Sequence, residues 1–261
     1  GQYFPAKSII HAIDARAKIL LVIVLIVLIF LAGNAVSLIL MGLSVLAVML
    51  ASKIPLKTYL KCLKPVWPII VLTALLNVFY VQGGIELVHF WIFTISTKGL
   101  MTAAYMAVRI ALLILCSSML TYTTSPTELT DAMERLLKPL KVLHVNVHEL
   151  SMMMTIALRF IPTLIEETDK IMSAQKARGA DMESGGLMQR IKALVPVLIP
   201  LFISAFRRAD ELATAMECRC YQGGEGRTKM KQLHYQRNDF AAFGAAALLT
   251  AAVIILKKFG M

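Results

Sequence analysis

Two arginines, each set between small residues, are the side chains whose surroundings most favour recognition chemistry. They occur in the triplets Ala177-Arg178-Gly179 and Cys218-Arg219-Cys220, and each triplet follows a long stretch with helical periodicity. A guanidinium is planar and binds a carboxylate through two parallel hydrogen bonds. With only small residues beside it, the arginine side chain would extend farther from the helix end than its neighbours do. Such a tip can insert into a groove of a partner protein and pair with an acid there.

The same triplets also have a purely local interpretation. A cation near the C-terminus of a helix is stabilised by the helix dipole, and a small residue after it can adopt the left-handed backbone that ends many helices. However, small residues bracket the arginine both times, and each helix is too long to be a simple connector. We therefore favour the partner-binding interpretation and keep the capping role as its alternative.

Other residue patterns do not indicate catalysis. The sequence has no G-x-x-x-x-G-K-[ST] motif, so this chain is not expected to bind ATP by itself. It also has no nucleophile elbow. Cys218 and Cys220 are neighbours, but no second ligand pair stands at zinc spacing. The sequence therefore predicts a protein that is not an enzyme and that holds no metal and no cofactor.

Two long amphipathic helices are expected to position the arginines, over residues 148–177 and 187–217. The apolar side of the first carries Leu150, Met154, Ala157, Ile161, Leu164 and Ile171, and that of the second carries Leu194, Leu198, Leu201, Ala205, Leu212 and Met216. Charged residues, among them Arg207 and Arg208, are expected to be solvated. The apolar section of each helix is shorter than the roughly 20 residues that cross a bilayer. Both helices are therefore expected in or below the membrane interface.

The composition predicts an integral membrane protein, because 58% of the residues are hydrophobic and only 16% are charged. The net charge of +11 indicates loops on the cytoplasmic side that face anionic lipid, and no nucleic-acid binding. Residues 19–52 carry no charge. As one helix they would be about 51 Å long, which exceeds the roughly 30 Å hydrocarbon core. Two short helices that meet near Gly33-Asn34 are therefore expected.

Three further spans are expected, over residues 65–81, 99–122 and 240–256, with an outer loop at 82–98. Arg109 lies near the middle of the span 99–122, where a charge is costly unless it is paired. It could line a substrate path, but we favour packing against a partner acid or the carbonyls of a helix end.

The expected fold class is therefore all-α, a polytopic membrane protein with about five transmembrane helices and a cytoplasmic or interfacial domain. Residues 1–122 form a transmembrane domain of four helices, 123–238 a coupling domain with the two long helices, and 239–261 a last transmembrane helix.

Beyond these patterns, the sequence resembles the T component of energy-coupling factor transporters across nearly its whole length. This is the transmembrane coupling subunit of a branch of the ATP-binding cassette importers. The family's two Ala-Arg-Gly signatures match at Ala177-Arg178-Gly179 and, for the arginine alone, at Cys218-Arg219-Cys220. Further similarity lies in "GQYFPAKSIIHAIDARAK", "TTSPTELTDAME", "LRFIPTLIEETDKIMSAQKARGAD" and "AMECRCYQGGEGRT".

The resemblance implies a role as a non-catalytic subunit in the plasma membrane of a prokaryote. The helices that end at Arg178 and Arg219 would each dock on one of two cytoplasmic ATPase subunits. Their other faces would hold a membrane-embedded, exchangeable S component that captures a vitamin. We expect that interface to include Met152, Met153, Met154, Leu198 and Leu201, because methionine side chains adapt to several partners. The similarity is closer to T components that serve several vitamins than to dedicated cobalt or nickel systems.

One departure from the family pattern concerns Cys220, which stands where glycine is usual. A left-handed backbone would be strained there, so the second helix is expected to end instead at Gly223-Gly224. The alternative function is a self-sufficient channel or ion-coupled carrier with Arg109 in its path. Such carriers usually show internal repeats and acidic residues within their spans, and neither is found. An intramembrane enzyme is a third alternative, without an acid–base or metal constellation behind it.

Overall fold

The computed structural model describes residues 3–81, 83, 86–90, 93–143, 146–180, 186–223 and 234–258. The chain divides into two compact units. Unit 1 comprises Gly1–Ala132 and Lys231–Met261, and unit 2 comprises Met133–Met230. The last helix of the chain therefore belongs with the first six, because the chain returns to unit 1 after unit 2.

Unit 1 is built mainly from apolar helices. Its elements are α1 (Ile9–Ala12), α2 (Ala15–Leu31), α3 (Ala35–Ala51), α4 (Leu56–Leu63), α5 (Trp67–Tyr80), β1 (Glu86–Phe90), β2 (Phe93–Ser96), α6 (Thr97–Thr123) and α10 (Arg237–Lys258). Helix α7 (Pro126–Leu137) begins in unit 1 and ends in unit 2, which also holds a 3₁₀ turn (Lys138–Leu143), α8 (Val147–Ala177) and α9 (Leu187–Cys218). The expected all-α class is confirmed. Strands β1 and β2 form one antiparallel hairpin within residues 82–98, which were predicted as a loop.

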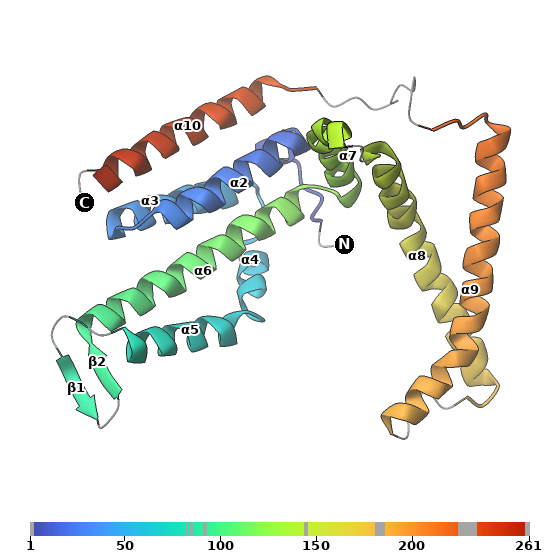
Figure 1. The fold of residues 1–261 in the computed structure, drawn as a ribbon, viewed down its shortest axis with the longest axis horizontal. Helices are drawn as coiled ribbons and strands as arrows, with labels where there is room; N and C mark the ends of the chain where they lie inside the picture. Colours follow the sequence, from blue (N-terminus) through green and yellow to red (C-terminus); the bar gives the residue numbers. More distant parts are fainter. Residues whose placement is uncertain are drawn as a thin grey trace. The chain divides into compact units, whose positions relative to one another are not determined.

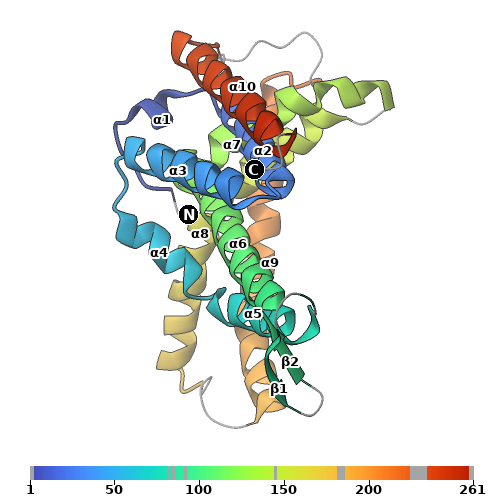
Figure 2. The same ribbon diagram turned by 90° about the vertical axis from the view of Figure 1, so that its left-hand side faces the viewer.

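Helix α6 lies in the middle of unit 1, between α5 and α2 (Figure 1). Its residues Leu112, Cys116, Met119 and Tyr122 belong to a buried apolar cluster that also draws on α2, α3, α4 and α10. Figure 2 shows α10 crossing close to α2 and α3. A central helix that is apolar on several sides can bury contacts with all its neighbours, and this position explains why α6 organises the unit.

The end of α5 lies close to the start of α6, which follows it in the chain after the β-hairpin. The hydroxyl of Ser96 caps α6 by accepting a hydrogen bond from the Gly99 amide at 3.0 Å, and it donates to the Val81 carbonyl at 2.9 Å. A Cβ atom on Gly99 would lie 2.8 Å from that same carbonyl oxygen and 3.0 Å from the carbonyl oxygen of Val78. Glycine is therefore required for the end of α5 to approach α6 this closely.

The uncharged stretch 19–52 forms two helices, as predicted, with the break at residues 32–34 between α2 and α3. Each helix has 17 residues and is about 26 Å long, slightly less than the hydrocarbon core. Three of the described helices are long and apolar enough to cross a membrane, namely α6, Met188–Cys218 of α9, and α10. Helices α4 and α5, which meet at 58°, together make a fourth candidate.

The result for α9 differs from the expectation that its apolar section is too short to span. The section between Ala193 and Phe206 is extended at its start by a turn with two cations, Arg190 and Lys192. Long cationic side chains at the end of an apolar helix can reach toward water, so these two cations are compatible with a membrane-spanning helix. Pro196 and Pro200 lie inside α9, and Figure 1 shows that its ribbon bends in the N-terminal half.

Unit 2 is dominated by α8 and α9, which pack as an antiparallel hairpin. The Gln175 side chain donates to the Pro196 carbonyl at 3.3 Å near one end of the pair. Farther along, Glu167 of α8 accepts a hydrogen bond from the Ser204 hydroxyl and pairs with Arg208 at 3.1 Å. The expectation that Arg208 is solvated is wrong, because this half-buried guanidinium faces α8. The Glu167 contacts thus join the two helices near their middle.

Candidate functional site

The C-terminus of α8 has a complete Schellman cap with Arg178 at its centre. The Gly179 amide donates to the Lys176 carbonyl at 3.0 Å, and the Ala180 amide donates to the Gln175 carbonyl at 3.0 Å. Gly179 adopts φ +85°, the left-handed region that this cap requires. The cap satisfies the last carbonyls of the helix with backbone amides. The Arg178 side chain is therefore not needed for capping.

The C-terminus of α9 repeats this cap with Arg219 at its centre. The Cys220 amide donates to the Glu217 carbonyl at 2.8 Å, and the Tyr221 amide donates to the Met216 carbonyl at 3.0 Å. Cys220 adopts φ 55°, so it occupies the left-handed position that Gly179 holds in α8. For a residue with a side chain this conformation costs roughly 1–2 kcal/mol.

This geometry corrects the expectation that α9 continues to Gly223-Gly224. The helix ends at Cys218, Gly223 lies in the following turn with φ +90°, and Gly224 lies outside the described residues. The two hydrogen bonds that the cap forms at the end of α9 offset the conformational strain at Cys220. As a result, both arginines occupy the same position in the same motif.

Both guanidiniums are exposed. In the part of the chain that the structure describes, neither has a hydrogen bond or an ion pair within the molecule. The residues before and after each arginine are small and exposed. Each tip is therefore free to form two hydrogen bonds with an external carboxylate.

The two tips lie near opposite ends of the α8–α9 hairpin. Helix α8 has 31 residues and is therefore roughly 45 Å long. Because the helices are antiparallel, Arg178 lies at the end where α9 begins. Arg219 lies at the other end, where it lines a groove together with Met152 and Thr155 of α8 and Met216 of α9. This spacing allows the two arginines to engage two separate partner molecules.

The predicted S-component interface residues are divided between these two ends. Met153 and Met154 are exposed on the first turns of α8, and Met152 is half-buried in the groove beside Arg219. Leu198 is exposed and Leu201 half-buried in α9, which pairs there with the later turns of α8. The structure therefore does not bring the three methionines and two leucines into one patch.

A broader apolar face on α9 was missed by sequence reasoning. Its exposed members are Ile191, Val195, Ile199, Phe202, Ile203 and Phe206. Phe202 and Phe206 have 60% and 68% of their surface exposed, although both are large and apolar. The signal was present in the sequence as apolar residues at helical spacing, but the predicted apolar side of this helix was drawn through other residues, Leu194, Leu198 and Leu201 among them.

Arg109 has a structural contact in unit 1. Its Nη2 atom donates to the carbonyl oxygen of Ala32 at 2.6 Å, and Ala32 is the C-cap residue of α2. The break between α2 and α3 leaves carbonyls without helical partners, and in an apolar environment each must be satisfied inside the protein. Of the two roles considered for Arg109, this geometry corresponds to packing against a helix end.

Among the described residues, no group of three or more His, Cys, Asp or Glu could hold a metal ion. Cys218 and Cys220 are exposed free thiols beside Arg219.

Comparison with known proteins places these features in a family. The family described as CbiQ: Cobalt transport protein matches residues 6–230. The chain is 50% identical over 258 residues to the "Energy-coupling factor transporter transmembrane protein EcfT" of Ruminiclostridium cellulolyticum, covering 98% of this chain and 96% of that protein. Proteins of the same name are 51% identical over 259 residues in Clostridium kluyveri, covering 99% and 96%, and 44% identical over 257 residues in Bacillus subtilis, covering 98% and 97%. Because these matches extend over nearly all of both chains, with the arginine-tipped helix ends inside the matched region, the chain belongs to the CbiQ family.

Proposed function

We propose that this chain is the energy-coupling transmembrane subunit of an energy-coupling factor importer. It transmits the ATP-driven motion of two cytoplasmic ATPase subunits to a membrane-embedded S component that binds a vitamin. The relatives named EcfT and the family match support the assignment to this class of transporter. In this role the chain is a multi-pass membrane protein of a prokaryote and performs no catalysis itself.

The observation that carries the proposal is the pair of identically capped, exposed arginine tips on one hairpin. Each backbone cap is complete without its arginine side chain, so the guanidinium is available to a partner. The tips stand near opposite ends of a helix pair roughly 45 Å long, a spacing that suits two ATPase subunits side by side. Closure of the ATPases would then pull or tilt both helices at once.

The unpartnered apolar face of α9 and the exposed methionines of α8 suit the S component. Non-polar faces of this size on a single chain are usually covered by lipid or by another protein. In this proposal, unit 1 is the transmembrane domain and unit 2 is the coupling domain at the membrane interface. The face that holds Phe202 and Phe206 then contacts the S component, together with Met153 and Leu198.

Replacement of both arginines tests this role. In the R178A/R219A double variant, we expect the ATPase subunits to be lost from the complex in mild detergent. Uptake of labelled vitamin into proteoliposomes should fall with them. The matched control is Arg207→Ala, since Arg207 is also exposed on α9 but lies within the helix. Unchanged assembly and uptake in the double variant would defeat the proposal.

The purified chain alone tests the alternative of a self-sufficient channel or carrier. Arg109 is bonded to the Ala32 carbonyl at the break between α2 and α3, and this contact does not favour a substrate path. Liposomes that contain only this chain should therefore show no flux of labelled vitamin or of small ions. Sustained flux without the ATPases and the S component would support the alternative.

A further inference from the structure

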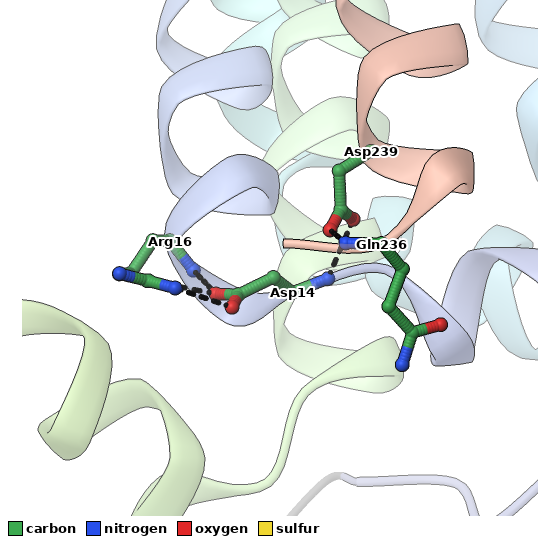
Figure 3. Close-up of polar contacts among 4 residues, drawn as sticks. All are labelled: Asp14, Arg16, Gln236 and Asp239. Atoms are coloured by element: carbon green, nitrogen blue, oxygen red, sulfur yellow. Dashed lines mark hydrogen bonds and ion pairs between the residues drawn. The ribbon is translucent and has the colours of Figure 1, made fainter. Parts of the chain in front are cut away.

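One buried carboxylate, that of Asp239, joins the beginnings of α2 and α10 through a bond to Asp14, which lies 225 residues earlier in sequence. Asp239 has no exposed surface. Its Oδ1 atom accepts a hydrogen bond from the Asp14 amide at 2.9 Å, and its Oδ2 atom accepts one from the Gln236 amide at 2.6 Å (Figure 3). The same side chain therefore caps the first turn of α10 and fixes the residue that caps α2.

Asp14 and Arg16 extend this connection. The Asp14 carboxylate accepts from the Arg16 amide at 2.9 Å and from the Arg16 guanidinium at 2.8 and 3.1 Å (Figure 3). The guanidinium in turn lies over the ring of Tyr235, 4.3 Å from its centroid. Tyr235 lies two residues before α10, so the start of α2 holds the incoming chain by a second contact.

Lys18 connects the same region to the end of α6. It is only 5% exposed, and its ammonium donates to the carbonyl oxygen of Thr123 at 2.9 Å and to that of His11 at 3.2 Å. Thr123 is the last residue of α6. The negative charges of Glu128, Asp14 and Asp239 only partly offset the cost of burying this ammonium, and Glu128 lies in the first turn of α7. We call Asp14, Arg16, Lys18, Thr123 and Asp239 the anchor cluster.

All members of the anchor cluster belong to unit 1, and in sequence Thr123 and Asp239 lie close to the points where the chain leaves and re-enters this unit. The chain leaves unit 1 through α7, which follows Thr123, and it returns to unit 1 shortly before Tyr235 and Asp239. Asp14 is bonded to Asp239, and Lys18 is bonded to Thr123. A displacement carried into unit 1 along the backbone therefore reaches residues that this cluster holds.

Capping alone does not account for this arrangement. An ordinary N-cap aspartate accepts from amides of its own helix and remains near water. Here, buried charges are shared among three helices, although apolar residues of similar volume often give equal stability at buried ion-pair sites. A buried polar network does, however, hold its members in one geometry, because any displacement leaves a charge unpaired.

We propose that the anchor cluster is the fixed point that converts motion of unit 2 into motion of the membrane helices, and this inference rests on the function proposed above. It holds the end of α6 and the start of α10 together. When the ATPases move the α8–α9 hairpin, both helices therefore receive the displacement as one body. Without the cluster, the end of α6 and the start of α10 move independently. ATP hydrolysis then continues, but less substrate is transported. Its members are positioning residues, since they touch neither nucleotide nor substrate.

The test uses the assembled transporter in proteoliposomes, with ATP hydrolysis and vitamin uptake measured on the same sample. In the Asp239→Asn variant, an amide group replaces one acceptor and opposes a backbone amide. We expect the ATP consumed per vitamin transported to rise at least about fivefold, while the ATPases stay bound. The matched control is Asp210→Asn, an exposed aspartate of α9, which should keep the wild-type ratio.

A milder variant separates coupling from folding. Tyr235→Leu removes the contact with Arg16 and leaves all bonds of Asp239 in place, and Tyr235 is already 45% exposed. This variant should assemble normally and raise the ATP per vitamin by about two- to fivefold. If uptake and hydrolysis fall in proportion in either variant, the cluster is only structural. If Asp239→Asn does not assemble and Tyr235→Leu keeps the wild-type ratio, the inference is likewise wrong.

Failure of the proposed function would look different. In that case the wild-type chain would not retain ATPases or support ATP-dependent uptake, and no ratio could be measured. The R178A/R219A variant provides the contrast, because it should lose the ATPases themselves. The anchor variants should keep them and lose only the efficiency of transport.

Discussion

In unit 1, the charged groups of Asp14, Lys18 and Asp239 are buried and bonded within the chain, whereas in unit 2 the guanidiniums of Arg178 and Arg219 face solvent. Among the described residues of unit 2, only Val147, Ser151 and Val197 are buried. Unit 1 therefore pairs these buried charges internally and packs its own core. Unit 2 consists mainly of two long helices whose apolar and cationic side chains are largely exposed.

Substitutions in the two units should therefore have different measurable effects. A substitution that unpairs a buried group of unit 1 should lower the stability of the isolated chain. A substitution at a tip of unit 2 should leave that stability nearly unchanged and alter assembly instead. Four sets of variants test this division of roles.

The largest effect is expected from Arg109→Leu, which leaves the Ala32 carbonyl without its charged donor at the break between α2 and α3. The loss should be about 1.5–3 kcal/mol of unfolding free energy, since hydrogen bonds to charged groups are worth that much. Thermal unfolding of the chain in detergent measures it. Arg109→Lys keeps a donor and should recover part of the loss. Equal unfolding temperatures for wild type and Arg109→Leu would contradict the role given to this contact.

Gly99→Ala should destabilise unit 1 by about 1–3 kcal/mol, because the new Cβ would meet two backbone carbonyls that cannot easily move. The control is Gly42→Ala in α3, where the nearest atom to a new Cβ is a Leu112 methyl at 4.0 Å. That control should be neutral or slightly stabilising, as alanine favours a helix over glycine. If both variants unfold at the same temperature, the close approach of α5 and α6 is not tight.

Opposite substitutions at the two caps of unit 2 should each change the stability of the helix end by about 1 kcal/mol. Cys220→Gly should relieve the left-handed strain and stabilise the end of α9, whereas Gly179→Ala should introduce the same strain into α8. Nothing lies within 4 Å of a Cβ on Gly179, so the effect is conformational and not steric. Amide hydrogen exchange at Tyr221 and Ala180 reports each cap separately. Slower exchange after Gly179→Ala would rule out this account.

Glu167→Gln should have the smallest effect, about 0.2–1 kcal/mol, because the pair with Arg208 is partly exposed and screened. The bond from Ser204 can be kept by the glutamine. Limited proteolysis of the α8–α9 hairpin measures the change, with the neighbouring exposed Glu166→Gln as control. A large loss here would show that unit 2 depends on internal pairing as strongly as unit 1 does.

Much of the fold was predictable because its signals are local. The length of the uncharged stretch 19–52 predicted two helices with a break near Gly33-Asn34, and the break lies there. The periodicity over 148–177 and 187–217 predicted two long helices, which agree with α8 and α9 to within one residue at each end. The arginine triplets were found the same way, from the types of neighbouring residues.

The errors concern contacts between distant segments or a balance between opposing energies. The partner of Arg208 is Glu167 on another helix, and periodicity along α9 carries no information about it. The end of α9 at Cys218 was missed because the prediction considered only the strain at Cys220. It did not include the two hydrogen bonds that the cap forms. Likewise, the apolar face with Phe202 and Phe206 was not identified, since a sequence does not show which apolar face finds a partner in the same chain.

Composition and periodicity were enough to predict the membrane character, the lengths of α8 and α9, and the two arginine tips, because these signals act within a few turns, whereas about five spans were expected and three or up to four of the described helices qualify. The packing of the helices established that Asp14 meets Asp239 from the far end of the chain, that Lys18 bonds to Thr123, that Arg109 bonds to the Ala32 carbonyl, and that the two tips lie at opposite ends of one hairpin. The physical reason is that a buried polar group is stable only beside its partner, and that partner is chosen by how the helices pack.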